Sequence, residues 1–304
     1  MGLHAPAPKI GMLLNVNNFT VDPATLAKAV EAAGFESLWV GDHPVIPVST
    51  TTPMRGTGEA AVPEAYAHVS DPFVALSMAA AATSTLRLGT GICIVAARHP
   101  IVTALQVATL DYFSGGRLLF GVGAGWLREE LEVMGVDYPR RLAQAREYVE
   151  AMRALWRDPE ASFEGEWVSF PPVRLNPRPA QEGGPRVLLG TWGPKAVQRV
   201  AEWADGWLPM LLSPDELEVE IEKLHVECEN RGRNAADIEV TVLEYDPGGD
   251  RAASQDFLAR YAAAGAHRVV IIQGLGDHMG SREWSSWSAE RFGEQLSRVA
   301  ERYL

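Results

Sequence analysis

Cysteine is almost absent from this sequence, and so are the signatures of export and membrane insertion. The two cysteines, Cys93 and Cys228, do not form a C-x-x-C pair, so we expect neither a disulfide framework nor a zinc or redox motif. No run of about 18 apolar residues predicts a membrane span. The first residues also lack the basic and apolar regions of a signal peptide. We therefore expect a protein of the reducing cytoplasm with no membrane partner.

Positive charge is also scarce, because the net charge is -12. Nucleic acid is thus an unexpected partner, since phosphate binding needs a basic surface. An anionic ligand would have to be held locally, by helix N-termini and a few arginines. No Gly-x-Ser-x-Gly sequence offers the nucleophile of a hydrolase. No pair of side chains has the spacing of metal ligands, so we expect no metal site.

What the sequence does contain is a regular alternation of short apolar runs and amphipathic segments. Helix starts are marked by Asp22-Pro23, by Asp71-Pro72 and by a capping box from Ser213 to Glu216. Strands are expected at residues 9–16, 37–41, 86–94, 117–122, 186–191, 206–210, 238–243 and 267–272. Eight strands alternating with about eight helices predict an α/β fold, a closed (β/α)8 barrel, as a single domain over residues 1–304.

Two segments interrupt this alternation. Residues 44–70 follow the second strand, show no periodicity and are rich in Pro, Thr and Gly. A loop of this length after the carboxyl end of a strand is more typical of a functional lid than of a connector. Residues 162–185 predict a short β-ribbon and a proline-rich run. We interpret them as part of an insertion over about residues 157–185.

Asp42 and His43 are the first candidates for chemistry, because they end the second strand and are followed by a proline. The carboxyl ends of barrel strands carry the active site, although a surface histidine beside a turn aspartate is the simpler alternative. Glycine clusters end the third and fourth strands, where a flat ligand could approach the backbone or the chain could simply turn. Trp126 stands where a dinucleotide fingerprint needs its third glycine, so we reject that motif.

Other polar residues are weaker candidates. Gly193-Pro194-Lys195 opens a helix whose free N–H groups, with Lys195 and Arg199, could hold a phosphate. Tyr66 and His68 lie in the expected lid and could contact the substrate. Arg98-His99 could reach an anion. Asn15 and Asn17 are expected at the barrel mouth, whereas His225 and His278 suggest no function.

Several ordered motifs together resemble the luciferase-like monooxygenase superfamily. They are ESLWVGDH (36–43), LRLGTG (86–91), GRLLFGVGAGW (116–126), VSF with RLNPRP (168–179), GPKA (193–196) and ADGW (204–207). The sequence is most similar to the branch that uses the deazaflavin coenzyme F420, and the branch that uses FMN is the alternative. The resemblance implies a barrel with one insertion and a flavin-type ring across its mouth. It also makes a homodimer the default expectation.

The resemblance assigns roles to particular residues. Asp42 matches a cofactor-contacting aspartate, and His43 matches a histidine next to the reactive ring. Gly91 and Ile92 occupy the place of a bulge that backs the ring, often with a non-proline cis peptide. The remaining cofactor contacts implied are Ala124 and Gly125 on a cofactor loop, and Gly193, Pro194, Ala196 and Val197 on the phosphate-binding loop and helix start.

One departure from the family concerns Trp126. The F420-dependent sugar-phosphate dehydrogenases of this family carry a glutamate base at this position, so we do not carry their substrate over. Trp126 instead suggests a more apolar substrate near the ring. Glu129 and Glu130 follow closely but are expected to be solvated on a short helix. Trp39 and Trp192 are candidates to flank the ring.

Three functions are therefore compared. The first is hydride transfer between F420 and a small organic substrate, with His43 exchanging the accompanying proton, because imidazole gains and loses a proton near neutral pH. The second is an FMN-dependent monooxygenase of the same fold. The third, of another class, is a barrel that binds a flavin without catalysis. The identity of the substrate has no signal in the sequence.

Overall fold

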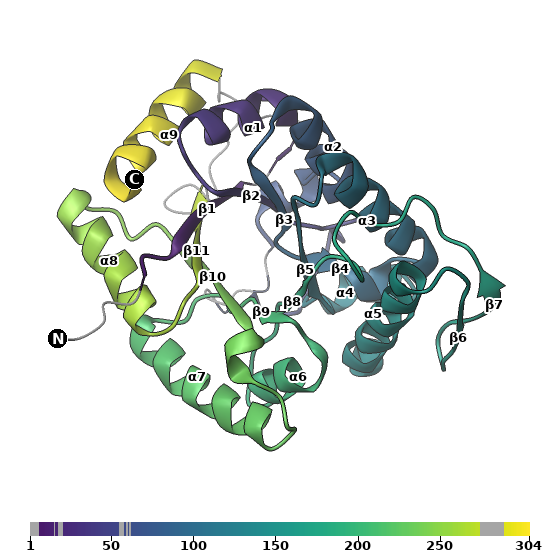
Figure 1. The fold of residues 1–304 in the computed structure, drawn as a ribbon. Helices are drawn as coiled ribbons and strands as arrows, with labels where there is room; N and C mark the ends of the chain where they lie inside the picture. The colour runs from purple at the N-terminus through teal and green to yellow at the C-terminus, as the bar shows by residue number, and fades with distance from the viewer. Residues whose placement is uncertain are drawn as a thin grey trace.

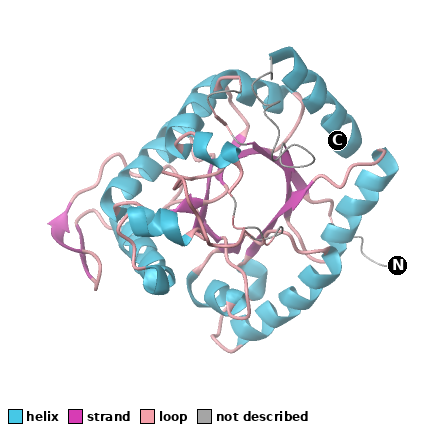
Figure 2. Cartoon of the chain, turned by 180° about the vertical axis from the view of Figure 1, so that it is seen from behind, coloured by secondary structure: helices cyan, strands magenta, loops and turns pink. Residues whose placement is uncertain are grey.

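The chain folds as the expected parallel barrel of eight strands enclosed by helices (Figure 1). The computed structural model describes residues 6–14, 16–17, 21–54, 58, 60, 62–273 and 289–304. The ring consists of β1 (Lys9–Leu14), β2 (Ser37–Val40), β3 (Arg87–Thr90), β5 (Leu118–Gly123), β8 (Val187–Leu189), β9 (Gly206–Trp207), β10 (Glu239–Tyr245) and β11 (Arg268–Gln273). Parallel pairing of β11 with β1 and of β3 with β5 closes it, and Figure 2 shows the ring from behind.

Helices cover the outside of the ring, between consecutive strands. They are α1 (Pro23–Ala32), α2 (Pro72–Ala82), α3 (Pro100–Ser114), α4 (Arg128–Val133), α5 (Arg141–Arg157), α6 (Ala196–Trp203), α7 (Pro214–Glu229), α8 (Arg251–Ala263) and α9 (Ala289–Tyr303). The predicted caps are confirmed: Asp22 and Asp71 accept backbone hydrogen bonds at the starts of α1 and α2, and the Ser213–Glu216 capping box opens α7. The predicted insertion is confirmed as the hairpin β6 (Ala161–Glu164) and β7 (Ser169–Val173), which projects from the side of the barrel.

The third predicted strand, residues 86–94, is wrong as a single strand. It is divided into β3 and β4 (Cys93–Ile94), and each of these two strands pairs with β5. Between them the Gly91–Ile92 peptide bond is cis, so the chain bulges at the barrel mouth. The bulge expected from the family resemblance is therefore present.

The interior of the barrel is filled by inward-facing apolar side chains, and this layer forms the floor below the mouth. Trp39 is its largest member and is fully buried. Gly89 makes room for it, because a Cβ at position 89 would lie 2.2 Å from the indole ring. The glycine at the end of β3 thus admits a side chain of the neighbouring strand, and the expectation that it admits a ligand is wrong for this position.

In the part of the chain that the structure describes, no helix has both the length and the apolar character needed to cross a bilayer. Cytoplasmic location stays a prediction. The same residues contain no group of three His, Cys, Asp or Glu side chains that could hold a metal ion.

Candidate active site

A cavity opens at the carboxyl ends of the strands, where the sequence places the candidate residues. Its volume is about 210 Å³. Its floor is apolar and includes Leu13 of β1, Leu208 after β9 and Leu243 of β10. Of the predicted site residues, Asp42, His43, Gly91, Ile92, Ala124 and Gly125 line this cavity. The barrel therefore brings together predicted site residues from three separate parts of the sequence.

His43 is held by a carboxylate that the sequence analysis did not assign to the site. Its Nδ1 atom lies 3.0 Å and 3.2 Å from the two carboxylate oxygens of Glu130. The Glu130 side chain is fully buried and that of His43 is 10% exposed. Because a carboxylate only accepts hydrogen bonds, Nδ1 carries the proton of the neutral imidazole, and Nε2 is left for a ligand.

The expectation that Glu130 is solvated is wrong. Glu130 shares one face of the α4 region with Leu127 and Leu131, both fully buried, and this face points into the protein. A buried carboxylate needs a partner, and His43 is that partner. The i, i+3, i+4 spacing of Leu127, Glu130 and Leu131 was the available signal, although it does not identify the partner.

The neighbouring Glu129 has a different role. Its carboxylate accepts hydrogen bonds from the backbone N–H and the hydroxyl groups of Thr51 and Thr52, at 2.6–3.1 Å. Burial alone would raise the pKa of Glu129, but these hydrogen bonds lower it to about 2. Adjacent residues of α4 thus fasten the long loop after β2 and the histidine at its start.

We predict that replacing Glu129 by alanine releases this loop. The amides of Thr51 and Thr52 should exchange with deuterium at least about tenfold faster in a hydrogen-exchange experiment, since they lose their acceptor. In the native protein the pKa of Glu129 is lowered from its ordinary value of 4.5 to about 2, so the carboxylate keeps its charge in weak acid. The amides should therefore lose their protection only as the pH falls towards about 2. Glu132→Ala, on the exposed face of α4, is the control. Unchanged exchange in the Glu129 variant would contradict the assignment.

Two aromatic rings frame His43 on its other sides. The Tyr66 ring lies 4.9 Å from the imidazole, centroid to centroid, and the Trp126 ring lies 6.3 Å from it, both edge to face. Tyr66 comes from the 3₁₀ helix Glu64–His68 in the long loop. Tyr66 lines the cavity, and its contact with a substrate stays a prediction.

Asp42 is buried in the cavity wall and forms a fixed ion pair. Its carboxylate accepts from Arg98 Nη2 at 2.7 Å, from Arg98 Nε at 2.9 Å and from the backbone N–H of Ile94 at 2.9 Å. Arg98 also contacts Asp71, at 2.9 Å. The expectation that Arg98 serves an external anion is therefore wrong. Asp42 also lines the cavity, so it could still contact a cofactor there, and that contact stays a prediction.

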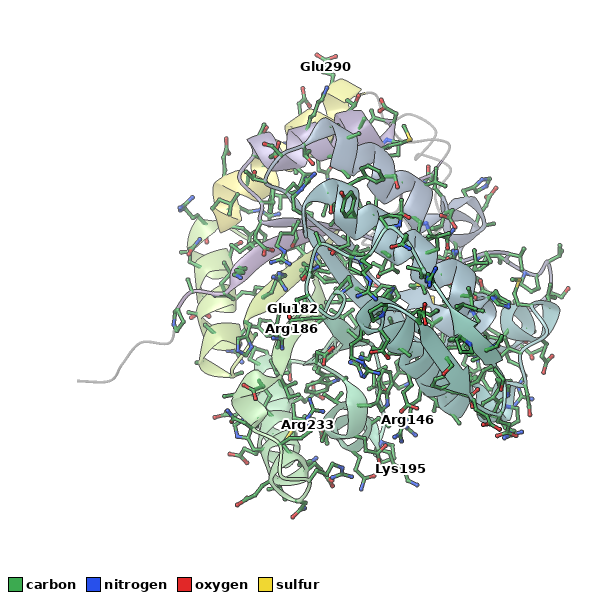
Figure 3. The ribbon with its side chains drawn as sticks, turned by 45° about the vertical axis from the view of Figure 1, so that its right-hand side comes forward. Arg146, Glu182, Arg186, Lys195, Arg233 and Glu290 are labelled. Atoms are coloured by element: carbon green, nitrogen blue, oxygen red, sulfur yellow. The ribbon has the colours of Figure 1, made fainter. Side chains whose placement is uncertain are left out.

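One part of the cavity wall carries positive charge. Arg141 and Arg199 both line the cavity, and neither forms an ion pair with a described residue. Burial lowers the pKa of Arg141, and Arg199 and Arg128 lower it further by repulsion. A patch of unpaired arginines in an acidic protein is suited to an anion. Lys195 is exposed at the edge of the molecule, away from the barrel strands (Figure 3).

The remaining candidates lie near this part of the wall or outside the site. Gly193, Pro194 and Ala196 line a second hollow that shares Thr191, Trp192 and Met210 with the cavity. Val197, in the first turn of α6, is buried in the hydrophobic core. Trp192 borders the cavity as expected, but Trp39 lies beneath it and does not line it. His225 is exposed on α7, and Asn15 and His278 lie outside the described residues.

Comparisons with known proteins agree with this architecture. The family model described as luciferase-like monooxygenase matches residues 22–245. An uncharacterized protein of Mycobacterium tuberculosis is 36% identical over 265 residues, which cover 86% of this chain and 90% of that protein. The F420-dependent tetrahydromethanopterin reductase structure from Methanopyrus kandleri gives a TM-score of 0.74 at 19% identity, covering 97% of this chain and 98% of its own. The monooxygenase RslO1 from Streptomyces bottropensis gives 0.69 at 21%, with the same coverage.

Proposed function

This chain belongs to the luciferase-like monooxygenase family, and we propose that within the family it is an F420-dependent oxidoreductase. The observation that carries the proposal is the His43–Glu130 pair at the rim of an apolar cavity. Such a pair can exchange one proton while the apolar walls keep water from the reacting atoms.

The cavity residues fit a flavin-type cofactor. A flat ring can lie against the Gly91–Ile92 bulge and the Ala124–Gly125 backbone, where Gly91, Ala124 and Gly125 carry little side-chain bulk. Gly125 has a φ of 82°, a conformation that favours glycine, and a Cβ at this position would lie 3.0 Å from the Leu131 side chain. Arg141, Arg199 and the N-terminus of α6 would hold the phosphate.

The residues of the chain have separate parts in the reaction. A bound deazaflavin supplies the acceptor and donor of a hydride. His43 Nε2 gives or takes the accompanying proton at the substrate, and the Glu130 carboxylate stabilises the imidazolium that forms when the proton is taken. Trp126 and the apolar floor favour a small organic substrate of low polarity.

FMN remains the second candidate cofactor, because Arg141 and Arg199 suit the single phosphate of FMN equally well. The solved F420-dependent reductase with the same fold supports the choice of F420. A carrier without catalysis is the third candidate, but it gives no reason to bury a carboxylate against His43.

Turnover in the absence of oxygen separates these candidates. The protein is mixed with reduced F420 and a panel of oxidised organic compounds without oxygen, and the return of F420 absorbance is followed. Parallel assays with reduced FMN record oxygen consumption. Anaerobic oxidation of reduced F420 supports the proposal. Oxygen consumption that requires FMN would replace it by monooxygenation.

We also propose a homodimer that forms through α2 and α3. These neighbouring helices expose Val74, Met78, Val102, Leu105, Tyr112 and Phe113. Their only charged residue, Asp111, is fully buried. A helix pair without exposed charge is unusual on a chain of net charge -12, and two such chains would repel except through a neutral face.

We predict that the double variant Leu105→Glu/Phe113→Glu is monomeric. Two buried carboxylates per subunit would cost far more than a dimer interface of ordinary size can offset. Light scattering coupled to gel filtration measures the mass. Val226→Glu, at an exposed apolar position of α7, should leave the mass of a dimer unchanged. A monomeric wild-type protein would contradict the dimer.

A further inference from the structure

Tyr66 is fixed at the mouth of the barrel, although it belongs to the long loop after β2. The chain that follows its 3₁₀ helix is tied to the end of β1 by a bridge between Val69 and Asn17 and by a hydrogen bond of 2.8 Å from Ser70 N to Val16 O. Asp71 then caps α2. The position of Tyr66 is therefore set before any ligand arrives.

The Tyr66 side chain faces the cavity and the imidazole of His43. It lines the cavity, and its ring packs against the apolar floor near Met210 and Tyr245. No described residue forms a hydrogen bond with its hydroxyl group. Burial, and then the proximity of Tyr245, raises the pKa of Tyr66 above its ordinary value of 10. The phenol thus keeps its proton at neutral pH and is a hydrogen-bond donor without a protein acceptor.

Most of the other polar groups around His43 already have protein partners, so they are poor candidates to donate a hydrogen bond to a substrate. Glu130 occupies Nδ1, and Glu129 is bound to the loop. The Arg141 guanidinium donates to the carbonyls of Gly125 and Tyr138. Tyr66 and Trp126 are the two aromatic rings beside the imidazole, and the Tyr66 ring is the nearer, at 4.9 Å against 6.3 Å. Tyr66 is therefore the candidate to bind a substrate oxygen together with Nε2.

We propose that the Tyr66 hydroxyl donates a hydrogen bond to the oxygen on the reacting carbon of the substrate, while His43 Nε2 exchanges a proton with the same oxygen. The inference rests on the proposed function and narrows it to interconversion of an alcohol and its ketone or aldehyde. In oxidation, the C–H bond breaks and its electron pair leaves with the hydrogen to the deazaflavin. The O–H proton goes to Nε2, and the carbon–oxygen double bond forms. The substrate loses two electrons, the deazaflavin gains them, and reduction is the reverse.

The test compares Tyr66→Phe with wild type on F420-loaded protein. Reduced F420 is oxidised anaerobically by ketones and aldehydes from cyclohexanone to acetophenone, and the matching alcohols reduce oxidised F420. We expect Tyr66→Phe to lower kcat by about 100-fold, the effect of removing one donor to a developing oxyanion, with little change in KM. Tyr148→Phe, which removes a hydroxyl that accepts from Gln144 on α5, should behave as wild type.

Equilibrium measurements distinguish a role in chemistry from a role in folding or cofactor binding. The F420 dissociation constant, from fluorescence quenching, and the melting temperature of Tyr66→Phe should match wild type. Activity of Tyr66→Phe within threefold of wild type would overturn the proposal. So would an F420-loaded wild type that turns over no carbonyl compound or alcohol in the panel, although the cofactor assignment would stand. A wild-type protein that does not bind F420 would contradict the proposed function, and the role of Tyr66, which rests on that function, would be contradicted as well.

Discussion

Replacing His43 by alanine should lower kcat by at least about 100-fold, because positioned acid–base groups typically contribute 10²–10⁴-fold. The imidazole is the one group at the rim that combines an available nitrogen with a buried carboxylate behind it. Its removal leaves hydride transfer without a partner for the proton. Steady-state kinetics with F420 and a substrate from the panel measure the loss.

F420 affinity should change by no more than a few-fold in this variant, since the phosphate and ring contacts come from other residues. His225→Ala, an exposed histidine on α7, is the matched control and should be fully active. A His43→Ala protein that binds F420 and turns over at the wild-type rate would remove the histidine from the mechanism.

Replacing Glu130 by glutamine should lower kcat by about 10–100-fold. The amide has nearly the same shape and can still accept a hydrogen bond from Nδ1, but it carries no charge to stabilise the imidazolium. The variant therefore tests charge rather than packing. Melting temperatures of the wild type and the variant establish that the fold is kept.

The control for this variant is Glu132→Gln, which removes an exposed charge of the same helix. The double variant His43→Ala/Glu130→Gln should be no slower than His43→Ala alone, because Glu130 acts through the imidazole. Additive losses would show that Glu130 acts on the reaction independently of His43.

The barrel could be predicted from the sequence because the same unit, a strand followed by a helix, recurs along the chain and each unit has its own local pattern. The strands and helices have local apolar patterns, and α1, α2 and α7 have their own capping residues, so an error at one element does not change the assignment of the others. The same reasoning placed Asp42 and His43 at the mouth, since the carboxyl ends of parallel strands meet there. The cis peptide at Gly91–Ile92 followed from the family resemblance and has no local signal of its own.

The side-chain partners could not be predicted, because they depend on contacts between distant parts of the chain. Glu130 lies 87 residues from His43, and Arg98 lies 56 residues from Asp42. Charged residues on short helices are usually solvated, so the sequence predicts an exposed Glu130. Its burial follows only from the packing of α4 against the barrel mouth. The unpartnered hydroxyl of Tyr66 is likewise visible only when the loop is in place.

The central claim is that this cavity holds F420 beside the His43–Glu130 pair. Separate titrations of the purified protein with oxidised F420 and with FMN, followed by fluorescence and absorbance, test it most directly. The account predicts saturable binding of F420, at least about tenfold tighter than any binding of FMN. Tighter binding of FMN, or binding of neither cofactor, would contradict it.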